Sequence, residues 1–192
     1  MTGYSFDKGV NGIRSNKNVI ESMAYISLCT ACLCLGSLFV IPLPFTAAVL
    51  SFQTVFINLT ALCLKKKEAV LSVVLYLFMG IIGLPVFSGG SSGVSKLVSP
   101  VGGYYFGFLA CVFLISLLKG KTPDMKRYLF LTVFIGITVQ HIFATVFMSI
   151  ITSSGLWQSF LIISLPFIPG DILKAVASAV IAVPLNKALT KK

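Results

Sequence analysis

The sequence predicts an all-α, polytopic membrane protein with six transmembrane helices and with both termini in the cytoplasm. Of the 192 residues, 57% are hydrophobic and only 10% are charged, whereas charged residues make up about a quarter of a typical soluble domain. The apolar residues form continuous runs, which are typical of membrane helices and unlike the alternating strands of a β-barrel. We therefore expect residues 1–192 to form a single integral membrane domain.

Six apolar runs predict the spans in chain order. Their approximate bounds are 20–41, 47–64, 69–87, 104–118, 128–151 and 160–188. The first run is too long for the core of a cleaved secretory signal. Pro166 and Pro169 interrupt the last run, and a Gly/Ser-rich stretch at 88–103 separates the third span from the fourth. The glycines of this stretch favour turns, so we expect an outer loop there.

The basic residues predict the orientation of the chain. The net charge is +10, and all but two of the 15 lysines and arginines lie in the N-terminal tail, after the second and fourth runs, or at the C-terminus. Positive residues stay preferentially on the cytoplasmic side, and six spans with both ends inside bring these clusters to that side. The clusters lie between apolar runs and form no face interleaved with aromatics, so we expect no nucleic-acid partner.

An acidic and a basic residue lie together in the last run. Lys174 follows Asp171 by three positions, which places both on one helix face, and Ser178 continues the polar stripe. A charge at the centre of a membrane helix costs about 2.5–3.5 kcal/mol, so both charges need partners. Counted from a boundary near Lys187, Asp171 lies about 24 Å along the helix, in the outer third of the bilayer core. The pair indicates an externally accessible cavity; the alternative is a salt bridge that only fixes helix packing.

The outer loop at 88–103 is a second candidate for ligand binding. Its glycines, which include Gly89 and Gly90 after Ser88, let backbone amides approach a ligand closely. Lys96 is the only basic residue in the predicted outer connections. These features favour binding of an anion, and an ordinary flexible loop is the alternative. The loop does not match a nucleotide-binding P-loop, because no Gly-Lys-Ser/Thr follows the glycines.

Other polar residues in the predicted spans carry weaker signals. They either line the cavity or bond to neighbouring helices, and they are Gln53, Asn58, Tyr76, Gln140 and His141. His141 has no acidic or second histidine partner at ligand spacing, and the cysteines of the first span point in different directions, so we expect no metal site. Gly103 and Gly107 form a GxxxG pair, which is typical of close helix packing.

Five segments of the chain are distinctive, and two of them, the stretch at 83–90 and the Pro-Gly-Asp-x-x-Lys element at 169–174, are specific in combination. The five segments are IPLP at 41–44, LSFQT at 50–54, GIIGLPVFSGG at 80–90, PVGGY at 100–104 and PGDILK at 169–174. Together they resemble the BioY family, the biotin-binding S components of energy-coupling factor (ECF) transporters. The resemblance extends from about residue 40 to the C-terminus. It implies a multi-pass protein of a prokaryotic cell membrane that binds biotin near the outer face, with no cofactor and no enzymatic activity.

The resemblance also implies roles for the candidate residues. Asp171 would accept the ureido N–H groups of biotin, and Lys174 would donate to the ureido carbonyl or to the ligand carboxylate. Phe87 and Tyr104 would enclose the ring and its aliphatic tail, and Lys96 or the loop amides would meet the carboxylate. The predicted substrate-binding residues are Asp171, Lys174, Gln53, Phe87, Ser88, Gly89, Gly90, Lys96 and Tyr104.

The partners that the resemblance implies are a transmembrane coupling subunit of the EcfT type and two cytoplasmic ATPase subunits. S components usually present an Ala-xxx-Ala seam of the first helix to the coupling subunit, and the nearest form here is Ser27-xxx-Ala31. Small residues permit such close approach, so Ala24, Ser27 and Ala31 are the predicted partner contacts, with packing inside the fold as the alternative. The family commonly has Thr where this chain has Val101, so any hydroxyl contact there is lost.

Two alternative functions are also consistent with the sequence. An S component for another vitamin, of the thiamine or riboflavin type, would share the architecture. A small intramembrane enzyme would instead use Asp171 and Lys174 as acid and base on a lipid substrate.

Overall fold

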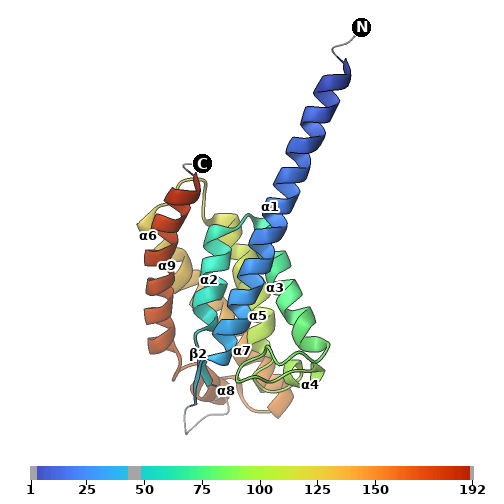
Figure 1. The fold of residues 1–192 in the computed structure, drawn as a ribbon. Coiled ribbons are helices and arrows are strands. Elements are labelled where there is room, and N and C mark those ends of the chain that lie inside the picture. The colour runs from blue at the N-terminus through green and yellow to red at the C-terminus, as the bar shows by residue number, and fades with distance from the viewer. Residues whose placement is uncertain (1–3, 43–48, 191–192) are drawn as a thin grey trace.

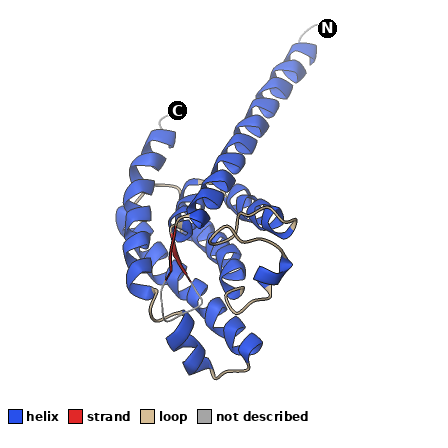
Figure 2. Cartoon of the chain, turned by 60° about the horizontal axis from the view of Figure 1, so that its bottom comes forward, coloured by secondary structure: helices blue, strands red, loops and turns tan. Residues whose placement is uncertain are grey.

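The computed structural model describes residues 4–42 and 49–190, with side chains for 19–41 and 51–189. This part of the chain forms a helical bundle with one short antiparallel hairpin (Figures 1 and 2). The elements in chain order are α1 (Tyr4–Leu38), β1 (Val40–Pro42), β2 (Val49–Ser51), α2 (Gln53–Cys63), α3 (Lys66–Ile81), α4 (Val94–Leu97), α5 (Gly103–Leu118), α6 (Met125–Phe130), η1 (Leu131–Gly136), α7 (Ile137–Thr152), α8 (Leu156–Ile163) and α9 (Ile168–Thr190).

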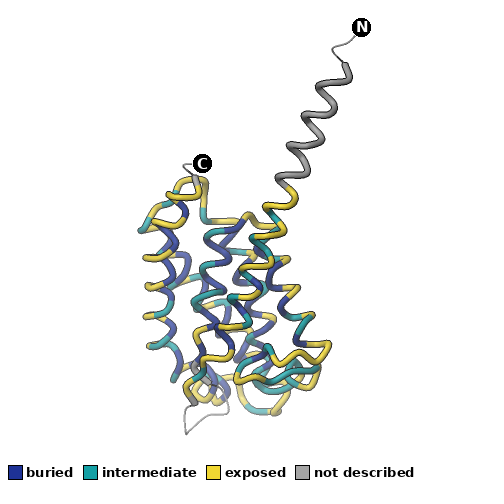
Figure 3. Tube along the Cα trace, in the orientation of Figure 1, coloured by how far each residue is buried: buried dark blue, intermediate teal, exposed yellow. Residues whose placement is uncertain are grey.

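Within the described residues, three helical stretches are long and apolar enough to cross a membrane. They are Val19–Leu38, Met125–Thr152 and Ile168–Leu189, and α2 and α5 are shorter apolar helices. Large hydrophobic side chains such as Phe78, Phe134 and Leu173 point outward and are exposed. Figure 3 shows exposed residues along the outer sides of the helices and buried ones along the inner sides. An apolar outer surface of this extent is typical of a protein surrounded by lipid.

The second predicted span is shorter in the structure than the apolar run at 47–64. The start of that run forms strand β2, which pairs with β1 so that Ile41 lies opposite Leu50. This pairing uses backbone groups that a helix would need, and α2 therefore begins only at Gln53. Eleven residues make a helix of about 16 Å, about half the thickness of the bilayer core.

The last apolar run, predicted as one broken span at 160–188, contains two separate helices. The carbonyl of Phe160 accepts the amides of Ser164 and Leu165, which ends α8. Helix α9 begins at Ile168, so Pro169 lies in the first turn, where its missing N–H is tolerated. Asp171 therefore lies in the first turn of α9, with its amide bonded to the Phe167 carbonyl at 2.9 Å.

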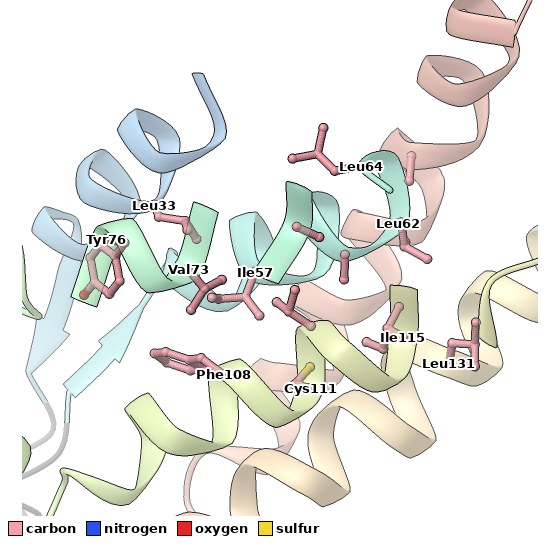
Figure 4. Packing of buried hydrophobic residues seen from close by; sticks show 14 of the residues in the cluster. Leu33, Ile57, Leu62, Leu64, Val73, Tyr76, Phe108, Cys111, Ile115 and Leu131 are labelled. Atoms are coloured by element: carbon pink, nitrogen blue, oxygen red, sulfur yellow. The ribbon is translucent and has the colours of Figure 1, made fainter. Parts of the chain in front are cut away.

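The bundle is closely packed between α1, α2, α3, α5 and α9. Leu33, Ile57, Val73 and Ile115 are fully buried in this core (Figure 4). Helix α5 approaches α7 so closely that a Cβ atom at Gly103 would lie 2.4 Å from the Phe143 carbonyl oxygen. The packing role predicted for the GxxxG pair is confirmed at this contact.

The two ends of the bundle differ in composition. The basic segments after α2 and α5 lie at the end where α1 starts and α9 finishes (Figure 1). Lys119 at this end donates from Nζ to the carbonyls of Leu62 and Leu64, which end α2. The hairpin, α4 and α8 lie at the opposite end. The basic loops after α2 and α5 thus lie at one end of the bundle, and the Gly/Ser-rich loop with α4 lies at the other.

Candidate ligand-binding site

A cavity lies among the hairpin, the 88–103 loop and the adjoining ends of α2, α5 and α9. Its volume is about 80 Å³, and one buried water needs only about 10–15 Å³ on the same measure. The lining residues are Ser51, Thr54, Ser88, Lys96, Val101, Tyr104, Tyr105, Phe108, Phe167, Asp171 and Lys174. The lining therefore combines polar and charged groups, here called the charged wall, with aromatic rings, here called the aromatic wall.

Asp171 is the centre of the charged wall. Its Oδ1 lies 2.5 Å from Lys174 Nζ, and its Oδ2 lies 3.1 Å from His141 Nε2. Lys174 also donates to the Ser51 carbonyl at 3.0 Å, which links α9 to the hairpin. The side chains of Asp171 and Lys174 are only 10% and 11% exposed, so the ion pair is held in a largely desolvated place beside the cavity.

This ion pair has hydrogen-bonding capacity left for a ligand. An ammonium group has three donors, and Lys174 uses two of them on Asp171 and Ser51. A carboxylate has about four lone-pair sites, and each oxygen of Asp171 has one protein partner among the described residues. The pair is thus ordered by the protein and still able to accept and donate at the cavity.

The aromatic wall comes mainly from α5. Tyr104 and Tyr105 each lie about one helical turn before Phe108, at i+4 and i+3 spacing, and both rings contact the Phe108 ring. The Tyr104 hydroxyl donates to the Ile163 carbonyl at 2.5 Å and lies 3.3 Å from His141 Nδ1. This network fixes the Tyr104 ring and the His141 ring together, and it orients the carboxylate of Asp171 through the imidazole.

Five of the predicted substrate-binding residues line the cavity: Asp171, Lys174, Ser88, Lys96 and Tyr104. Gln53 lies behind the lining, fully buried, where its Oε1 accepts weakly from the Ser88 hydroxyl at 3.5 Å. Phe87 also lies outside the lining. Its ring is fully buried and packs 4.6 Å from Tyr105, centroid to centroid, so it supports the aromatic wall from behind.

Gly89 and Gly90 differ most from their predicted role. The amide of Gly89 donates to Ser37 at 3.0 Å, and the amide of Gly90 donates to Phe87 at 2.9 Å. Both have positive φ values, 73° and 74°, which explains the choice of glycine at a tight turn. Neither lines the cavity. The loop amides that were expected to meet an anion at these two positions are already bonded to protein carbonyls.

His141 bonds to a neighbouring helix, which is one of the two roles that the sequence leaves open for it. No acidic partner lies at ligand spacing in the sequence, and the fold supplies one from another helix, since Asp171 lies 30 positions along the chain. No local spacing signals that contact. The lining residues absent from the prediction are Ser51, Thr54, Val101, Tyr105, Phe108 and Phe167.

The predicted partner stripe lies on the outside of α1. Ala24, Ser27 and Ala31 are all exposed in the chain as described. Thr30 and Leu33 on the same helix are buried and face the bundle. The small residues therefore take no part in the internal packing of α1.

Comparison with known proteins identifies the family. A model of the BioY family matches residues 9–191. A biotin transporter BioY from Thermotoga maritima is 35% identical over 146 residues, which cover 76% of this chain and 82% of the relative. A biotin transporter BioY2 from Lactococcus lactis subsp. cremoris is 30% identical over 172 residues, which cover 89% of this chain and 93% of the relative.

The fold agrees with the family match. A solved structure of the S-component for biotin from an ECF-type ABC transporter superposes with a TM-score of 0.80 at 27% identity, over 90% of this chain and 94% of the other. The relatives are transport proteins and not enzymes. Because the family model covers almost all of the sequence, the chain belongs to the BioY family.

Proposed function

We propose that this chain binds biotin in the cavity and serves as the substrate-binding S component of an ECF-type transporter. Membership of the BioY family and likeness to a biotin S component support the substrate. The observation that carries the proposal is the Asp171–Lys174 ion pair at the wall of a cavity whose lining also contains aromatic side chains. A buried ion pair is costly to maintain, and a ligand that completes its bonding explains why it is kept.

The two walls match the two kinds of surface on biotin. Asp171 accepts the ureido N–H groups, and the spare donor of Lys174 bonds to the ureido carbonyl. Tyr104, Tyr105 and Phe108 cover the fused rings and the aliphatic chain. Lys96, on the loop side of the cavity, receives the carboxylate at the end of that chain. His141 acts through Asp171, whose orientation it fixes.

The proposed membrane arrangement has six spans, with both termini in the cytoplasm of a prokaryotic cell. The basic loops lie at the end of the bundle where α1 starts and α9 finishes, in agreement with the preference of positive residues for the cytoplasmic side. The cavity lies toward the opposite end and thus opens to the outside. Closure of the loop at 88–103 over the cavity would hold the vitamin during transport.

The proposed partners are an EcfT-type coupling subunit and two cytoplasmic ATPase subunits, with no cofactor in the chain itself. Ala24, Ser27 and Ala31 lie exposed along α1 and offer a surface of small side chains to a partner helix. Close approach of helices in a membrane favours such residues. Energy for release into the cytoplasm would come from ATP hydrolysis by the partner subunits.

Equilibrium binding of labelled biotin to the purified protein in detergent tests the substrate. We expect unlabelled biotin to displace the label and an excess of thiamine or riboflavin to leave it bound. Lys174→Met should weaken binding at least about tenfold, because a charge-assisted hydrogen bond contributes about 1.5–3 kcal/mol. Lys187→Met, on the exposed far part of α9, is the matched control. Displacement by either other vitamin, or no biotin binding at micromolar concentration, would refute the proposal.

A further inference from the structure

Thr54 carries a buried hydroxyl group that the protein leaves without a partner. The residue lies in the first turn of α2, is 9% exposed and lines the cavity. Its Oγ1 atom is inaccessible to solvent and makes no hydrogen bond to any described residue. Buried polar groups are hydrogen-bonded in the great majority of cases, so this exception needs an explanation.

Other buried hydroxyls in the helices of this protein bond back to the preceding turn. Thr30 donates to the Ile26 carbonyl at 2.8 Å, and Thr132 donates to the Tyr128 carbonyl at 3.0 Å. Ser178 does the same with Lys174 at 2.7 Å. This i to i−4 bond is the ordinary solution for a serine or threonine inside a helix.

The hairpin denies this solution to Thr54. The residue four positions earlier is Leu50, which belongs to strand β2 and not to a helical turn. The carbonyl three positions earlier belongs to Ser51; it accepts from Lys174 and receives no bond from the Thr54 hydroxyl. Because Lys174 also contacts Asp171, Thr54 lies beside the charged wall of the cavity.

We propose that Thr54 is a further specificity-determining residue, whose hydroxyl turns about χ1 into the cavity that the residue lines and bonds to the cyclic urea end of the ligand next to Asp171 and Lys174. The inference rests on the proposed function. A hydroxyl has one donor and two acceptor sites, so it complements either the N–H or the C=O of a urea. The ligand-free protein then carries the cost of an unpaired buried group, and binding removes that cost.

Thr54→Val tests the inference, because valine keeps the shape of threonine and lacks the hydroxyl. We expect the affinity for biotin to fall about 3- to 10-fold, the effect of one neutral hydrogen bond. The affinity for biotin methyl ester, which is altered at the far end of the ligand, should fall by the same factor between the wild type and Thr54→Val. Thr54→Ser, which restores the hydroxyl, should bind biotin within about twofold of the wild type. The ligand-free Thr54→Val protein should unfold at the same temperature as the wild type or at a higher one.

Thr30→Val is the matched control, since this hydroxyl bonds to Ile26 and Ser72 away from the cavity. It should lower the unfolding temperature and leave biotin affinity unchanged. Wild-type affinity in Thr54→Val, or a lower unfolding temperature of its ligand-free form, would overturn the inference while the proposed function stands. If the wild type itself bound no biotin, the proposed function and the inference would both fail.

Discussion

Replacing Asp171 with asparagine tests the central contact of the site with the least change of shape. Asp171 accepts from Lys174 at 2.5 Å and from His141 at 3.1 Å, and its side chain is only 10% exposed. The substitution removes the negative charge toward which the ureido N–H groups of biotin are proposed to point. A hydrogen bond to a charged group contributes about 1.5–3 kcal/mol, which corresponds to a loss of affinity of about 10- to 150-fold.

Asp171→Asn should lower the free energy of unfolding by less than a substitution that removes the hydrogen-bonding group altogether. Truncating one member of a buried ion pair costs about 3–5 kcal/mol, because the other charge is left uncompensated. The amide retains an oxygen that accepts from Lys174, so we expect the free energy of unfolding to fall by less than this. The protein should therefore purify as a folded species whose binding can be measured.

Titration calorimetry in detergent gives the dissociation constants, and thermal unfolding without ligand gives the stability. Asp124→Asn is the control, because Asp124 is exposed at the opposite end of the bundle, where it caps α6 by accepting from the Lys126 amide. It should bind biotin like the wild type. Wild-type affinity in Asp171→Asn, or an equal loss in Asp124→Asn, would refute the role given to Asp171.

Three further predictions concern packing, pH and coupling. Gly80→Ala should lower the free energy of unfolding by about 1–3 kcal/mol, because its Cβ would lie 2.1 Å from the buried Phe87 ring; an unchanged denaturation midpoint would contradict this. Burial lowers the pKa of Lys119 from 10.5 to about 8. Between about pH 8 and pH 10.5 the unfolded chain therefore binds more protons than the folded one, and stability rises with pH in this range. Lys119→Met should flatten that rise in unfolding temperatures measured from about pH 7 to about pH 10. Equal slopes for the wild type and the variant would exclude this role of Lys119. Ala31→Trp, on the exposed face of α1, should block biotin uptake by cells and leave binding in detergent unchanged; normal uptake would remove this face from the interface.

The sequence predicts most helices because their apolar runs are long and their ends are marked by charges or proline. It fails at residues 49–51, where an apolar run forms a strand. A continuous apolar stretch has no periodicity that separates a buried strand from a helix, and only the pairing of Leu50 with Ile41 decides between them.

The candidate site shows the same division between local and long-range information. Asp171 and Lys174 could be paired from the sequence, since positions i and i+3 share a helix face. The contact of His141 with Asp171 joins two helices, and no spacing in the chain encodes it. Gly89 was expected to offer its amide to a ligand, but the direction of an amide depends on a turn whose partner, Ser37, lies far earlier in the chain.

The link from Lys174 to the Ser51 carbonyl has a consequence for how the site fills. One ammonium group anchors the hairpin and faces the ligand, and its third hydrogen is left over after both protein contacts are made. Vitamin capture and hairpin attachment therefore do not compete for the same proton. Strand β2, whose Ser51 lines the cavity, can therefore keep its hydrogen bond to Lys174 while the ligand binds.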